Sequence, residues 1–257
     1  MNEEASREPD VAGKSGTPQK RFRRAATFIV GTFAALLVGA ILFYTITYFY
    51  YIPRDTPAQK VAAAFREANK LLDERNPEDA VKRLTELLGR ISPQENPQLY
   101  ENAKRLRGRC YLWLARRADN KAYLRDAIAD FEDALQVSPP DRSPTTYATL
   151  QVLLGTTCRD LGAVSQPEEY LPKAVRALES ALTIYTREDF PFDYASTQNA
   201  LGIAYASLAR VSDKEENLTK AIHAYEAALE VLAGDPNSAA VNEKVRANLE
   251  AAKQAQR

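Results

Sequence analysis

The chain offers little material for catalysis or metal binding. Its 257 residues include a single histidine, His223, and two cysteines, Cys110 and Cys158. A hydrolytic triad needs a nucleophile and a base in defined geometry, and no known motif places a serine or a cysteine with His223. The cysteines and the histidine are also too few for an ordinary structural zinc site. We therefore expect no enzyme, no metal and no cofactor, and keep as a remote alternative a hydrolase that uses His223 as its general base.

Three further motifs bear on chemistry. Glycine-rich fingerprints that bind phosphate are absent from the sequence, which disfavours nucleotide chemistry. Cys110 and Cys158 lie one position out of register in neighbouring repeats, and helical positions one apart differ in direction by about 100°, so we favour two buried thiols over a disulfide. Asn217-Leu218-Thr219 matches a glycosylation acceptor. The corresponding segment at Tyr170 lacks it, and we interpret the match as coincidence.

Charge and composition narrow the partners. Lysine and arginine together number 34, as do aspartate and glutamate, so the chain has no global field to attract nucleic acid. Apolar residues make up 45% of the chain, which is enough for a sizeable core. Glycine is scarce and helix formers are common. The composition predicts an all-α protein with no nucleic-acid partner.

An uncharged apolar stretch at 25–52 predicts one transmembrane helix. It exceeds the roughly 20 residues needed to cross a bilayer, whereas the apolar region of a cleaved signal peptide would span only about 7 to 15. Basic residues crowd its front edge: Lys20, Arg21, Arg23 and Arg24. This asymmetry predicts a disordered cytoplasmic tail at 1–24, a linker at 53–57, and a remainder that lies outside the cytoplasm, in the periplasm or another extracytoplasmic space.

Small residues recur within this stretch. Gly31, Ala35 and Gly39 have four-residue spacing, which puts them on one helix face and would let two such helices approach closely. A homodimer through this face is one partner prediction. The plainer interpretation is that small residues are common in membrane helices.

The remainder of the chain carries an internal period of 47 residues. Its anchors are Gly108, Gly155 and Gly202, then Ala127, Ala174 and Ala221, then Ala134, Ala181 and Ala228. In the third unit, apolar residues follow helical spacing over 196–210 and again over 219–232, which predicts two antiparallel helices per unit. Such a unit buries its apolar face only by stacking on its neighbours, so we predict an α-solenoid.

The pattern resembles the tetratricopeptide repeat (TPR) family. Leu154-Gly155 and Leu201-Gly202 carry the family's Leu-Gly pair, and an apolar or aromatic residue and the alanines follow in the expected order. In the first unit Arg107 stands in place of the leucine. The family's usual unit has about 34 residues, so the longer period implies that both helices are lengthened.

The resemblance covers about 56–257 and implies one repeat domain at 58–257. The expected helix pairs lie at about 58–92, 97–139, 144–187 and 191–233. A capping helix at 236–255 follows, with Val241, Val245, Leu249 and Ala252 on one apolar stripe.

The resemblance also implies a binding face. In the family, the first helix of each unit lines a concave groove that holds a peptide. Eight residues are expected on that face: Arg105, Arg109, Leu112, Trp113, Thr156, Arg159, Asn199 and Ile203. Arginine and tryptophan are common at binding hot spots; alternatively, Arg105 and Arg109 form a solvated charged face while Trp113 packs against the next unit. The family's clamp for acidic chaperone tails is not reproduced, since Leu153, Ser196 and Ala200 occupy its positions.

These observations lead to one functional prediction. We expect a non-catalytic, membrane-anchored scaffold that binds a protein or peptide. By analogy with similar architectures, envelope protein biogenesis or assembly is a further expectation. The alternative is a membrane protein whose repeats mainly mediate homo-oligomerisation.

Overall fold

The structure, a computed structural model, describes residues 40, 43, 57–233 and 238–257. The chain divides into two compact units, Met1–Gln59 and Lys60–Arg257, and the helices below belong to the second, apart from the first residues of α2. None of the helices in the described ranges is both long enough and apolar enough to span a bilayer. The predicted span at 25–52 and the dimer face at Gly31, Ala35 and Gly39 lie outside the described residues, apart from Ala40 and Phe43.

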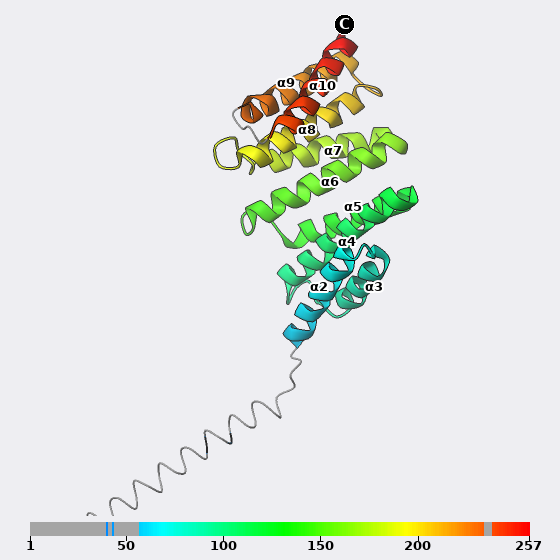
Figure 1. The fold of residues 1–257 in the computed structure, drawn as a ribbon, viewed down its shortest axis with the longest axis vertical. Coiled ribbons are helices and arrows are strands. Elements are labelled where there is room, and N and C mark those ends of the chain that lie inside the picture. Colours follow the sequence, from blue (N-terminus) through cyan, green and yellow to red (C-terminus); the bar gives the residue numbers. More distant parts are fainter. Residues whose placement is uncertain (1–39, 41–42, 44–56, 234–237) are drawn as a thin grey trace, which may run out of the picture. The chain divides into compact units, whose positions relative to one another are not determined.

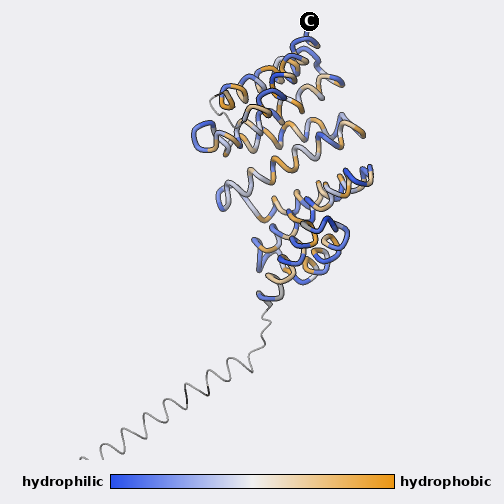
Figure 2. The backbone as a smooth tube through the Cα atoms, in the orientation of Figure 1, coloured by the Kyte–Doolittle hydropathy of each residue, from blue (hydrophilic) through white to orange (hydrophobic). Residues whose placement is uncertain are grey.

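All regular elements in the described part of the chain are helices, which confirms the all-α prediction there. They are α2 (Pro57–Asp73), α3 (Pro77–Leu88), α4 (Pro97–Ala118), α5 (Lys121–Val137), α6 (Pro144–Val164), α7 (Pro167–Leu182), α8 (Pro191–Leu208), α9 (Lys214–Leu232) and α10 (Ala239–Gln256). They pack in consecutive pairs, each pair against the next, with α10 against α9 at the end (Figure 1). Hydrophobic and hydrophilic segments alternate along each helix, as one-sided burial requires (Figure 2).

The turns inside the pairs follow the same period as the helices. Asp119, Gln166 and Asp213 are 47 residues apart, and each has a positive φ of 47°, 50° and 41°, respectively. Asp119 caps the C-terminus of α4, whereas Gln166 and Asp213 directly precede the first residues of α7 and α9. In each turn the left-handed residue redirects the chain into the second helix. Proline occupies the first position of six of the nine described helices, where its missing N–H would have no partner within the helix in any case.

Close approach within each long pair depends on a glycine. A Cβ built on Gly108 would lie 2.5 Å from the Phe131 ring, and one on Gly202 would lie 2.6 Å from the Tyr225 ring. At Gly155 the corresponding neighbour is Leu178 at 2.7 Å. The repeated glycines therefore let a large side chain from the second helix lie directly on the backbone of the first.

The core is continuous along the long pairs. One apolar cluster runs from Ala127 on α5 to Ala252 on α10, and a second joins α2, α3 and the first part of α4. Leu171 and Leu218, in the first turns of the second helices α7 and α9, are 2% and 4% exposed. On the predicted stripe of α10, Val245, Leu249 and Ala252 are buried, whereas Val241, in the first turn of the helix, is 47% exposed.

Candidate functional site

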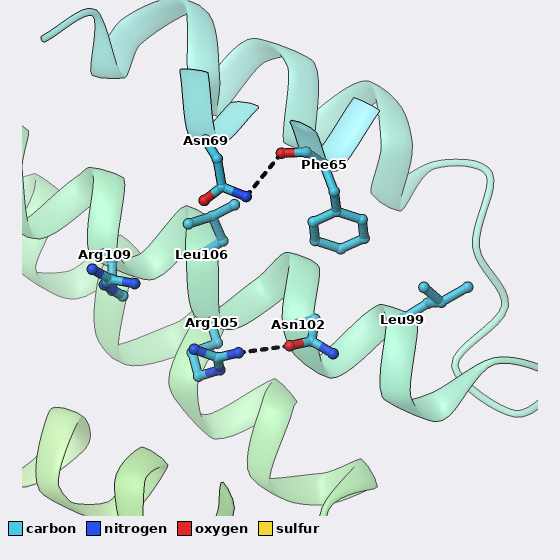
Figure 3. A pocket seen from close by; sticks show the side chains of 7 residues that line it. All are labelled: Phe65, Asn69, Leu99, Asn102, Arg105, Leu106 and Arg109. Atoms are coloured by element: carbon cyan, nitrogen blue, oxygen red, sulfur yellow. Dashed lines mark hydrogen bonds between the residues drawn. The ribbon is translucent and has the colours of Figure 1, made fainter. Parts of the chain in front are cut away.

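A groove of about 220 Å³ lies between α2 and α4 (Figure 3). It is lined by Phe65, Asn69, Leu99, Asn102, Arg105, Leu106 and Arg109. The contributions of α4 recur every three or four residues, which places them on one helix face. The structure thus brings the two predicted arginines, Arg105 and Arg109, into one site.

Arg105 is held in place by its own helix. Its Nε donates to Glu101 Oε1 at 2.9 Å, and its Nη2 donates to Asn102 Oδ1 at 2.6 Å. Glu101 is only 4% exposed, so the Arg105 guanidinium neutralises a buried carboxylate. Arg105 therefore shapes the groove wall, and its charge is already compensated.

Arg109 differs from Arg105 in having no compensating partner. It is exposed, and no residue of the described chain forms a hydrogen bond or an ion pair with its side chain. The half-buried Phe65 and the buried Leu106 line the same groove. The groove therefore combines an available guanidinium with an apolar floor, a pairing that suits a peptide with an apolar side chain and an acidic or carbonyl group.

The asparagines of the groove are oriented by hydrogen bonds to backbone carbonyls. Asn69 Nδ2 donates to the Phe65 carbonyl at 3.0 Å (Figure 3), and Asn102 Nδ2 donates to the Gln98 carbonyl at 2.9 Å. Both contacts lie within one helix, which fixes each amide relative to its own backbone. The oxygen of Asn69 remains as an acceptor for a ligand N–H.

The other predicted residues of α4 lie outside this groove. Leu112 is half-buried against the main core. Trp113 is 37% exposed, and the Arg117 guanidinium lies 5.6 Å from its ring centroid. Trp113 is therefore partly open to solvent and stacked by its own helix.

The predicted residues of α6 are engaged locally. The Thr156 hydroxyl donates to the Val152 carbonyl at 2.8 Å. Arg159 is paired with its neighbour Asp160, with 2.6 Å between Nη2 and Oδ1. Its charge also opposes the burial that raises the pKa of Tyr225 to about 12.

The predicted residues of α8 belong to another region. Asn199 Oδ1 accepts a long hydrogen bond of 3.4 Å from Asn248 on α10. Ile203 lines a separate cleft between α8 and α10. The eight predicted residues are thus distributed over three helices, and of these only Arg105 and Arg109 line the groove between α2 and α4.

Two residues of the groove that sequence reasoning missed carried a readable signal. Phe65 lies three residues before Ala68, and Asn69 lies one residue after it. Arg105 and Arg109 have the same positions relative to Gly108. Equivalent positions on adjacent first helices face the same side in a stack. Aligning α2 with α4 by these positions would have predicted Phe65 and Asn69 as groove residues. The first helix pair is shorter than the later pairs, and this difference obscured the alignment.

A buried ion cluster fixes α4 against its neighbours. Arg107 donates from Nε to Asp130 Oδ2 at 2.8 Å and from Nη1 to the Thr85 hydroxyl at 2.9 Å, which joins α5 and α3 through α4. Lys104 Nζ lies 2.9 Å from Asp130 Oδ1 and 2.6 Å from Asp133 Oδ2. Burial disfavours the charged form of Lys104, but its hydrogen bonds to Asp133 and Asp130 outweigh burial and raise its pKa.

The remaining candidates for chemistry are placed as follows. Cys110 and Cys158 are both buried and free, and burial raises the pKa of each thiol to about 12, so neither is a reactive thiolate. His223 is exposed on α9. Asn217 is 5% exposed and its Nδ2 donates to the Ser212 carbonyl at 2.8 Å, an arrangement that leaves no room for a glycan.

Comparison with known proteins adds no family assignment. No family model and no curated protein sequence matches the chain.

Proposed function

We propose that this protein is a non-catalytic, membrane-anchored helical-repeat scaffold that binds a protein or peptide partner outside the cytoplasm. One observation carries the proposal: the groove between α2 and α4 holds the uncompensated Arg109 beside the apolar side chains of Phe65 and Leu106. Helical repeats present extended surfaces of this kind to their partners. The TPR-like register of Gly108, Gly155 and Gly202 supports the same interpretation.

The membrane part of the proposal depends on the sequence. The uncharged stretch at 25–52 is long enough to cross a bilayer, and the basic residues before it favour a cytoplasmic amino terminus. A reporter fused after Arg257 tests this topology. We expect reporter activity outside the cytoplasm, and activity inside it would contradict the proposal.

The groove is tested by comparing captured partners. The full-length chain is purified from its native membrane after crosslinking, and co-purifying proteins are quantified for the parent, Arg109→Glu and Arg125→Glu. Arg125 is an exposed arginine on α5, so its reversal matches the change in charge without touching the groove.

We expect at least one captured protein to be lost with Arg109→Glu and retained with Arg125→Glu. Reversal of a charge that contacts an acidic or carbonyl group weakens binding through repulsion as well as through the lost contact. Equal capture by all three proteins would exclude the groove as the binding surface.

A further inference from the structure

We propose that a second cleft, between α8 and the last helix α10, binds a peptide segment that combines apolar side chains with an acidic residue. The cleft has a volume of about 680 Å³, and its apolar surface includes Ile203, Ala206, Ala252 and Ala255. It shares no lining residue with the groove between α2 and α4. This inference therefore stands apart from the site already proposed.

The cleft exists because α10 carries small residues where the repeats carry large ones. One period after Tyr205 and Leu208, the chain has Ala252 and Ala255. One period before Leu208, Leu161 is fully buried between its helices. The missing side-chain volume on α10 is what leaves space between α8 and α10.

The cations at this cleft have no counter-charge among the residues that the structure describes. Arg210 and Lys214 are exposed, they line the cleft, and neither side chain has a hydrogen bond or ion pair within the described ranges. No aspartate or glutamate is among the described residues that line it. An acidic group on the occupant would supply the absent charge, and Arg210 would bind it in two-pronged fashion.

The size and polarity of the cleft favour a peptide. A volume of this order lies within the range of about 300 to 1,000 Å³ that is typical of ligand sites. Asn248 also lines the cleft, and its only described hydrogen bond is the long one of 3.4 Å to Asn199. Its amide is therefore available to a peptide backbone, which presents both N–H and C=O groups.

Arg210 and Ser207 extend the binding surface beyond this cleft. Both also line a neighbouring cleft of about 510 Å³ that reaches the turn between α6 and α7. A carboxylate bound at Arg210 would thus lie where the two clefts meet. A peptide that extends beyond this carboxylate could also occupy the second cleft.

The test uses a phage library of short random peptides, selected on the full-length chain in lipid nanodiscs. We expect an enriched pool in which apolar residues accompany aspartate or glutamate. One enriched peptide is then labelled, and its affinity is measured by fluorescence anisotropy for the parent and for each variant. The same peptide with its acidic residue changed to the amide is measured alongside.

Two changes in the cleft are paired with two matched controls. Ala255→Leu restores the leucine of the repeats and fills the cleft, and Ala247→Leu makes the same change on α10 outside it. Arg210→Glu reverses the charge in the cleft, and Arg246→Glu does so elsewhere on the exposed surface of α10. We expect each cleft variant to weaken binding at least about tenfold, and each control to leave it unchanged.

Arg109→Glu separates this proposal from the first one, because it should not alter binding in the α8–α10 cleft. The proposal is overturned if no peptide pool is enriched, if the pool lacks acidic residues, or if Ala255→Leu binds the peptide as the parent does. Binding of decanoate, abolished by Ala255→Leu, with no peptide enriched would assign the cleft to a lipid and would also overturn it.

Discussion

The buried ion cluster on α4 predicts that substitutions of Arg107 and Asp130 do not have additive effects on the free energy of unfolding. Arg107 occupies the place of Leu154 and Leu201 in the later repeats, and Asp130 occupies the place of Ala177 and Ala224. One repeat therefore has a buried Arg–Asp pair where the others have an apolar pair. The side chains of Arg107 and Asp130 are 15% and 3% exposed.

The magnitudes follow from the contacts that each change leaves behind. Asp130→Ala leaves the Arg107 guanidinium without its carboxylate partner and removes one of the two carboxylates that bind Lys104. We therefore expect the free energy of unfolding to fall by about 3 to 5 kcal/mol. Arg107→Leu leaves Asp130 bonded to Lys104, and the loss should be smaller, about 1.5 to 3 kcal/mol. In the double variant both charges are gone and the repeat's own Leu–Ala pair is restored. It should be no less stable than Arg107→Leu alone.

The assay is urea unfolding of the full-length chain in detergent, followed by far-ultraviolet circular dichroism, for the parent, both single variants and the double. The double-mutant cycle should give a coupling of at least about 2 kcal/mol. Additive losses would refute the reasoning, because they would mean that Arg107 and Asp130 stabilise the fold independently.

Four other predictions concern core packing, a strained turn, thiol reactivity and the pH dependence of stability. Gly202→Ala should lower the free energy of unfolding by about 1 to 3 kcal/mol, because the new methyl group would lie 2.6 Å from the Tyr225 ring. Gly89→Ala should not destabilise the protein, because the nearest neighbour of its methyl group lies at 3.6 Å. Thermal unfolding compares the two variants, and equal effects would contradict this explanation. Gln166→Gly should raise the unfolding midpoint, since glycine relieves a φ of 50° that costs a side chain about 1 to 2 kcal/mol, and a lowered midpoint would show that the turn is unstrained. Cys110 and Cys158 should resist a thiol reagent at neutral pH until the chain unfolds, and rapid labelling of the native protein would contradict their burial. Because their folded pKa values of about 12 exceed the unfolded value of about 8.5, the unfolded thiols ionise first, so stability should fall as pH rises through this interval and be unaffected below it.

The helices and their pairing could be predicted because the same residues recur at one fixed spacing. Gly108, Gly155 and Gly202 mark where a second helix must approach, and a one-sided apolar pattern marks each helix. Leu171 and Leu218 could be assigned to the interior for the same reason. Val241 could not, since an apolar stripe does not reveal how far the neighbouring helix extends.

The groove could be predicted only in part. The spacing of residues along α4 shows which of them share a face, but it does not show which residues of α2 lie opposite that face. Arg105 and Arg109 line the same groove, yet their different roles depend on Glu101, which accepts a hydrogen bond from Arg105 alone. The cleft beside α10 could not be foreseen either. It results from Ala252 and Ala255, which are smaller than the residues at the corresponding positions of the repeats. In the sequence, such residues are only departures from the repeat pattern and do not indicate a cleft.

The central claim is that the groove between α2 and α4 holds a partner, and one measurement tests it most directly. A photo-reactive phenylalanine analogue replaces Leu99, which lines the groove, or Ala129, which is exposed on α5, in the full-length chain in living cells. After irradiation, we expect a discrete crosslinked partner from position 99 and none from position 129. A partner crosslinked equally from both positions, or from 129 alone, would contradict the claim.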